Sequence, residues 1–165
     1  LTDRDPTQLP WDDTEHKDWQ QRRMEVYAAQ IDRMDQGIGR ILTTLEETGQ
    51  LDNTLIIFLA DNGGCAEEIN KPWGNFLVGR IAHAETRDGR KVRFGNDPSV
   101  MPGGEDTYQS YGVPWANLSN TPFREYKHWV HEGGIATPLI IHWPDGVAGR
   151  GKLRHQARRI YSLRN

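Results

Sequence analysis

A long helical pattern that leads through one short turn into an uninterrupted apolar strand constrains this chain most. Apolar side chains recur at steps of three and four over residues 18–48, which predicts a long helix with one apolar face. Gly49 predicts the end of that helix, because glycine adopts the left-handed conformation that ends helices. Asp52-Asn53 predicts a turn. The apolar positions are Tyr27, Ile31, Met34, Ile38, Ile41, Leu42 and Leu45.

Two short apolar runs predict buried strands. Residues 54–60, TLIIFLA, have almost no polar interruption, which is typical of a strand covered on both faces in a parallel sheet between helices. Residues 139–142, LIIH, predict a second buried strand that ends at Trp143-Pro144. A helix, a tight connection and a buried strand together indicate the α/β class.

The segments between these elements predict mainly long, ordered loops. Residues 63–120 are rich in Gly, Pro, Asn and Asp, and their aromatic residues favour packing over disorder. Residues 79–97 could hold a short hairpin, but their alternation is poor and mostly loop is expected there. Residues 120–134, NTPFREYKHWVHEGG, predict a short helix capped by Asn120 or Thr121, and the Glu132-Gly133-Gly134 triplet predicts a turn into the next strand.

Length and charge exclude several classes of protein. A chain of 165 residues fits one domain or part of one, and we expect a single partial domain over residues 1–165. A net charge of -3 gives no field that attracts nucleic acid, and no apolar run approaches the ~20 residues that span a bilayer. The basic segment 147–165 is expected to be a solvated tail.

Asp61 and Asn62 follow the first predicted strand directly. Ligands of open α/β sheets bind beyond the carboxyl ends of the strands, and carboxylate and amide oxygens are hard donors that suit Ca²⁺ or Mg²⁺. Gly63-Gly64 would let the backbone turn sharply enough for both side chains to approach one ion. Asp-Asn-Gly is also a common turn sequence, so these residues alone leave a turn and a metal site open.

Other chemically competent residues carry weaker signals. Lys127 could neutralise an oxygen of a sulfate or phosphate group near a metal. His128, His131 and His142 could be bases or ligands, but histidines beside aromatic residues usually pack, so a structural role is expected for all three. Cys65, the single cysteine, has neither a base nor a helix start beside it that would make it a nucleophile.

Two segments together resemble the second half of the catalytic domain of the sulfatases, specifically the arylsulfatases. They are YAAQIDRMDQGIGRILTTLEETGQLDNTLIIFLADNGG and SNTPFREYKHWVHEGGIATPLIIHWP. The resemblance covers about residues 18–146. Three motifs occur in the same order as in the family: the Asp-Asn-Gly strand end, the NTPFR box and a lysine five residues before Glu-Gly-Gly. It implies an alkaline-phosphatase-like α/β sandwich with a mostly parallel sheet.

The resemblance also implies a function and residue roles. Sulfatases hydrolyse sulfate esters with a bound divalent cation, usually Ca²⁺; Asp61 and Asn62 match the second pair of metal ligands, and Lys127 matches the lysine that contacts sulfate. The family nucleophile is a formylglycine made in a Cys-x-Pro-Ser-Arg motif, which this sequence does not contain and which Cys65 does not match. We expect that motif, and the first Asp-Asp ligands, upstream of Leu1 in an intact parent protein.

Two alternatives remain open at this point. A phosphodiesterase or phosphonate-monoester hydrolase shares the metal-binding architecture of this superfamily, although the NTPFREYK and EGG boxes favour sulfate. A catalytically inactive remnant that binds a metal or a partner would explain the missing nucleophile. The sequence selects neither a particular sulfate ester nor an oligomeric state, and related enzymes are generally exported to the periplasm, lysosome or exterior.

Overall fold

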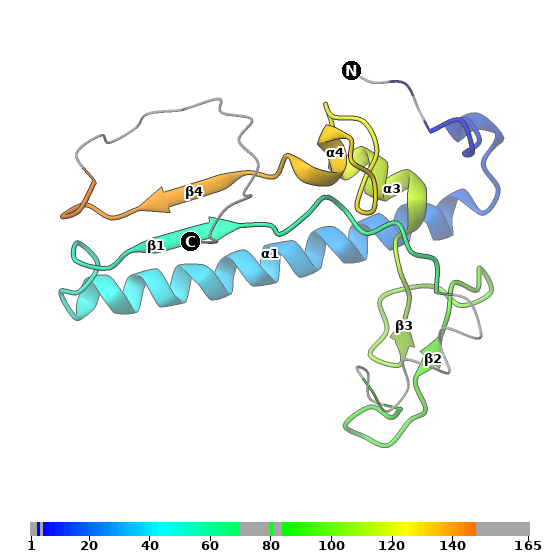
Figure 1. The fold of residues 1–165 in the computed structure, drawn as a ribbon. Helices are drawn as coiled ribbons and strands as arrows, with labels where there is room; N and C mark the ends of the chain where they lie inside the picture. Colours follow the sequence, from blue (N-terminus) through cyan, green and yellow to red (C-terminus); the bar gives the residue numbers. More distant parts are fainter. Residues whose placement is uncertain (1–2, 4, 70–79, 81–83, 148–165) are drawn as a thin grey trace.

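The computed structural model of the chain describes residues 3, 5–69, 80 and 84–147 (Figure 1). The basic tail, apart from Val147, and part of the segment 79–97 lie outside the described residues. The elements in chain order are η1 (Trp11–Asp13), α1 (Lys17–Glu47), β1 (Ile56–Leu59), β2 (Arg93–Phe94), β3 (Thr107–Tyr108), α3 (Gly112–Ser119), α4 (Glu132–Ile135) and β4 (Leu139–His142).

Helix α1 confirms the helix predicted from the apolar periodicity. It covers Lys17–Glu47 and ends where Gly49 takes a φ of +67°, a left-handed conformation that glycine adopts without a steric penalty. The amides of Gln50 and Leu51 both donate to the carbonyl of Leu45, which closes the helix end. Neither α1 nor any other helix in the described part of the chain combines the length and the apolar content that a membrane crossing needs.

Tryptophan side chains attach the first half of α1 to the loop at Val100 and to α3. Trp19 is buried, and its indole Nε1 donates to the carbonyl of Val100 at 2.9 Å. Trp115 of α3 donates from its Nε1 to the carbonyl of Gln20 at 2.9 Å. Buried indole N–H groups need such partners, so these bonds set the positions of that loop and of α3 relative to α1.

Arg23 forms a second attachment between α1 and the loops. Its side chain is buried, its Nε donates to the carbonyl of Ser110 at 2.7 Å, and its terminal nitrogen lies 3.0 Å from Glu68 Oε2. The guanidinium also lies 4.5 Å from the centre of the Trp19 ring. Burial lowers the pKa of Arg23, and the Glu68 carboxylate opposes that effect. A buried cation is stable only when it is paired in this way.

Strands β1 and β4 form a two-stranded antiparallel sheet with Ile56 opposite His142 and Leu59 opposite Leu139. The prediction of a parallel sheet was therefore wrong for this pair, because an apolar run identifies a strand but not the direction of its partner. Coverage of this sheet on both faces is also not found among the described residues, since Ile57 is 51% exposed and Ile141 is 53% exposed. The described parallel pairing is that of β2 with β3, two residues each.

The region between the strands differs in part from the prediction. Helix α3 lies in a segment that was predicted to be loop, and the helix predicted to begin at Asn120 is absent from the described structure. Glu125 and His128 have φ values of +67° and +83°, which interrupt any right-handed helix there. Glu132–Ile135 forms one helical turn, α4, instead of the simple turn predicted.

The described part of residues 79–97 contains a short hairpin, which the sequence had left open beside a loop. Glu85 and Lys91 form an antiparallel bridge, and the Thr86 amide donates to the carbonyl of Arg90 at 2.8 Å. Gly89, with a φ of +81°, provides the left-handed turn position. The expectation of ordered loops also holds here, since this segment has regular hydrogen bonds.

Replacing Arg23 tests the attachment of the loops to α1. Arg23→Ala should lower the free energy of unfolding by about 2–4 kcal/mol, because it removes the bond to Ser110 and the ion pair with Glu68 and leaves space where a buried side chain was. The neighbouring Arg22 forms only an exposed pair with Glu25, so Arg22→Ala should change it by less than about 0.5 kcal/mol. Urea denaturation followed by tryptophan fluorescence measures both; equal effects would contradict the role of Arg23.

Candidate functional site

Three backbone amides form hydrogen bonds between the loop that follows β1 and the segment 120–134. The Gly63 amide donates to the carbonyl of Gly134 at 3.0 Å, and the Gly64 amide donates to Asn120 Oδ1 at 3.0 Å. In the opposite direction, the Lys127 amide donates to the carbonyl of Gly64 at 3.0 Å. We call these three bonds the loop clamp; they hold the backbone of Lys127 against the turn that carries Asp61 and Asn62.

Asn120 is the side chain at the centre of the loop clamp. While its Oδ1 accepts from Gly64, its Nδ2 donates to the carbonyls of Ala116 at 2.9 Å and Glu125 at 3.0 Å. Sequence analysis assigned Asn120 only a possible helix cap. Its contact with Gly64 spans 56 positions of sequence, and no local pattern signals such a bond.

Glycines are required where the two segments meet. A Cβ on Gly63 would lie 1.8 Å from the carbonyl oxygen of Gly133, and one on Gly133 would lie 2.1 Å from the carbonyl oxygen of Glu125. Both obstacles are backbone atoms, which cannot rotate away as a side chain can. The Asn-Gly-Gly and Glu-Gly-Gly sequences therefore allow the backbones to approach closely as well as to turn.

The ammonium of Lys127 lies among acidic groups. Lys127 Nζ lies 3.3 Å from Glu67 Oε1. Charge on the nearby Cys65 sulfur, the hydrogen bond and charge of Glu67, and the charge of Asp61 raise the pKa of Lys127 above its ordinary value. Lys127 is consequently a cation at neutral pH, and Asp61 is near enough to influence it.

Glu67 is a site residue that sequence analysis missed. Its Oε1 lies 2.9 Å from His128 Nε2 as well as 3.3 Å from Lys127 Nζ, and its Oε2 accepts a hydrogen bond from the Cys65 thiol. The bonds from Cys65, His128 and Lys127 lower the pKa of Glu67 to about 2. The carboxylate is therefore charged throughout the neutral range, although its position in a Gly-rich loop gave no sign of these partners.

The remaining candidates have other surroundings. Burial, and then the Glu67 carboxylate, raise the pKa of the Cys65 thiol, which opposes a nucleophilic role. His131 packs near the Trp129 ring with the ring centres 6.2 Å apart, and His142 is an exposed residue of β4. Of the three histidines, His128 is thus the one that contacts the acidic group beside Lys127.

Asp61 and Asn62 can supply two oxygen donors for a cation. Asp61 is exposed and Asn62 is half-buried at the end of β1. Within the described ranges, His, Cys, Asp and Glu side chains do not gather in any group of three that could hold a metal ion. The donor chemistry fits a hard divalent cation, but a complete coordination shell needs further ligands.

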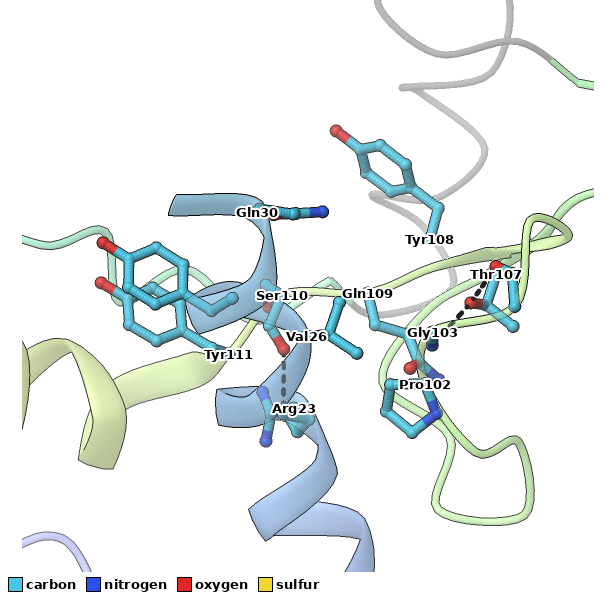
Figure 2. A pocket seen from close by; sticks show the side chains of 12 residues that line it. Arg23, Val26, Gln30, Pro102, Gly103, Thr107, Tyr108, Gln109, Ser110 and Tyr111 are labelled. Carbon is cyan, nitrogen blue, oxygen red and sulfur yellow. Dashed lines mark hydrogen bonds between the residues drawn. The ribbon is translucent and has the colours of Figure 1, made fainter. Parts of the chain in front are cut away.

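A separate hollow lies between α1 and the segment 102–111 (Figure 2). Its volume is about 330 Å³. Gln30 on α1 and Tyr108 on β3 line it, as do the rings of Tyr27 and Tyr111, which stack with their centres 4.6 Å apart. Asp61, Asn62 and Lys127 do not line this hollow.

Comparison with known proteins identifies the family. The family model described as Sulfatase matches residues 3–163. An uncharacterized sulfatase of Schizosaccharomyces pombe is 37% identical over 136 residues, which cover 81% of this chain and 23% of that protein. An arylsulfatase of Klebsiella aerogenes is 35% identical over 141 residues, covering 85% of this chain and 27% of its own length. A steryl-sulfatase of Mus musculus is 27% identical over 119 residues, or 72% of this chain and 13% of that protein.

This chain belongs to the sulfatase family. Membership confirms the recognised resemblance and implies the alkaline-phosphatase-like α/β fold, with which the helices and small sheets described here are compatible. The chain spans about a quarter of the length of the first two relatives. Sulfatases as a family use a divalent cation and act on sulfate esters.

Replacing Gly63 tests the loop clamp. Gly63→Ala should destabilise the protein by about 3 kcal/mol or displace the clamp, because its Cβ would overlap the Gly133 carbonyl. Gly39 in α1 has no atom within 4 Å of an added Cβ, so Gly39→Ala should instead stabilise it by about 0.5–1 kcal/mol. Thermal melting of both variants measures the contrast. Equal melting temperatures for Gly63→Ala and the parent would show that the segments do not meet as described.

Proposed function

We propose that this chain is part of an arylsulfatase-type sulfuric ester hydrolase in which Asp61 and Asn62 bind a divalent cation and Lys127 contacts the sulfate group. The loop clamp carries the proposal. It supports the proposal because it holds the backbone of Lys127 against Gly64, two residues after Asn62, although the two segments are far apart in sequence. Family membership and the arylsulfatase relative support the same reaction.

Each of the three side chains has a defined task in this proposal. Asp61 contributes a negative charge and Asn62 a neutral amide oxygen to the cation, for which Ca²⁺ is the expected ion. The Lys127 ammonium offsets the negative charge of the sulfate oxygens and the charge that grows on the leaving alcohol. When bound, the cation supplies Lewis acidity and orients the nucleophile against the sulfur.

Asp61, Asn62 and Lys127 do not complete the proposed site. Ca²⁺ takes about six to eight oxygen ligands, and Asp61 and Asn62 supply only some of these. The sequence has no Cys-x-Pro-Ser-Arg motif for the formylglycine, so the activity tests below use a full-length protein that contains this chain together with that motif. Because loops select the substrate in this family, the proposal extends to the sulfate ester class alone.

Asp61→Asn tests the cation site. The variant should raise the Ca²⁺ concentration needed for half-maximal hydrolysis of an aryl sulfate by at least about tenfold, because it removes one charged ligand. Asp52→Asn is the matched control, since Asp52 lies in the exposed turn before β1, where its backbone carbonyl accepts from Asp145. Calcium titration after chelation measures both. Equal Ca²⁺ dependence of the two variants would remove Asp61 from the ligand set.

Lys127→Ala tests the sulfate contact and separates the two esterase classes. The variant should lower kcat/KM for an aryl sulfate by about 100-fold or more, the usual effect of losing a group that stabilises transition-state charge. The same assays with an aryl phosphate test the alternative function, a phosphodiesterase or phosphonate hydrolase. Faster turnover of the phosphorus ester by the unaltered protein would favour that reading, and no turnover of either ester would favour an inactive remnant.

A further inference from the structure

Glu67 is a charged group that the proposed reaction does not yet use. Both of its oxygens are engaged: Oε1 lies 3.3 Å from Lys127 Nζ and 2.9 Å from His128 Nε2, while Oε2 accepts from the Cys65 thiol. Three side chains from two segments thus converge on one carboxylate. This convergence gives the Glu67 carboxylate a defined position in the loop after β1.

The bonds that fix the backbone of Lys127 do not fix its ammonium, so the ammonium needs a partner such as Glu67. The loop clamp fixes the backbone through the bond from the Lys127 amide to the Gly64 carbonyl. The ammonium is carried on a flexible four-carbon stem with three rotatable donors, and the side chain is 34% exposed. Without a partner, the charge would sample many positions in water, and only some of these would face Asp61.

His128 supports the same carboxylate from the next position in the chain. It takes a φ of +83°, which is uncommon for a residue with a side chain and costs about 1–3 kcal/mol where it occurs. In this conformation the side chains of Lys127 and His128 both reach Glu67 Oε1. A local backbone strain that brings two consecutive side chains to one acceptor is typical of a functional position.

We propose that Glu67 is a positioning residue for Lys127: it anchors the ammonium, and its bonds to His128 and Cys65 hold the carboxylate in place. The inference rests on the proposed function, since the anchored ammonium is the group that would meet the sulfate. The charged and titratable groups that face Lys127 in this cluster are Cys65, Glu67 and Asp61. Glu67 acts through Lys127 and has no contact with the substrate of its own.

The role of Glu67 predicts a change in both rate and pH dependence. In the full-length protein, Glu67→Gln should lower kcat/KM for an aryl sulfate by about tenfold, less than the loss expected for Lys127→Ala because the lysine itself remains. Without the negative charge, the pKa of Lys127 should fall, so the ammonium loses its proton at a lower pH. The alkaline limb of the pH profile should therefore move to lower pH, and Glu67→Asp should recover part of both effects.

Glu68→Gln is the matched control on the adjacent residue. Glu68 pairs with the buried Arg23 and does not contact Lys127 in the described structure. Its replacement should lower the melting temperature and leave the alkaline limb in place. If Glu67→Gln behaves in the same way, with a reduced melting temperature but unchanged kcat/KM and pH profile, then Glu67 is merely structural and the inference is overturned.

A second measurement separates failure of this inference from failure of the proposed function. NMR of protein labelled with ¹³C at lysine Cε reports the titration of Lys127, which Lys127→Ala identifies by the loss of its signal. Glu67→Gln should shift that titration to lower pH, whether or not the protein hydrolyses a sulfate ester. An unchanged Lys127 titration overturns the inference, whereas an inactive parent protein with a shifted titration overturns only the proposed function.

Discussion

The backbone contact between Gly63 and Gly134 is the constraint on which the rest of the site depends. It continues the pairing of β1 with β4: Leu59 lies opposite Leu139, Thr137 Oγ1 donates to the carbonyl of Ala60 at 2.6 Å, and the Gly63 amide then donates to Gly134. The segment after β1 and the segment before β4 therefore remain in contact beyond the end of the sheet. This places the turn with Asp61 and Asn62 beside the backbone of Lys127, and the close approach leaves no space for a larger residue at Gly63.

The sheet itself shows how much of its burial depends on other segments. Isolated two-stranded sheets are marginally stable in water, and fully burying a side chain such as Ile or Leu contributes roughly 1.5–3 kcal/mol. In this chain, Ile57 and Ile141 remain about half exposed. The apolar composition of β1 and β4 suits coverage on both faces, while the described residues, in a chain about a quarter as long as its first two relatives, leave them open.

Local patterns predicted the elements that local interactions determine. The periodicity gave α1 within one residue at each end, and the apolar run 139–142 matches β4. The antiparallel direction of β4 and the one-turn helix α4 depend on contacts between distant segments, so local sequence patterns could not predict them. Helix α3 was missed for a different reason: a segment that begins Gly-Val-Pro and has few strong helix formers gives a weak local signal.

The candidate site also contains some residues that the sequence predicts and others that only distant contacts define. Asp61, Asn62 and Lys127 could be proposed from the sequence because donor chemistry at a strand end, together with the family resemblance, selects them. Asn120 and Glu67 could not, since their roles arise from bonds to Gly64 and Lys127 across 56 and 60 positions. The sequence thus indicated the groups that would meet a ligand, and the structure adds those that hold them.

The two supports of Lys127 differ in their response to pH. The loop clamp consists of backbone amides and an asparagine, which do not titrate in the physiological range, so the position of the Lys127 backbone is independent of pH. Glu67 has a pKa of about 2, below its ordinary value, so the stability from its bonds is complete above the unfolded pKa of about 4.5 and declines as the pH falls toward 2. Protonation of Glu67 therefore cannot explain any loss of activity near neutral pH. An acid limb in that range would have to come from another group, whereas the alkaline limb is where the pairing of Glu67 with Lys127 would be observed.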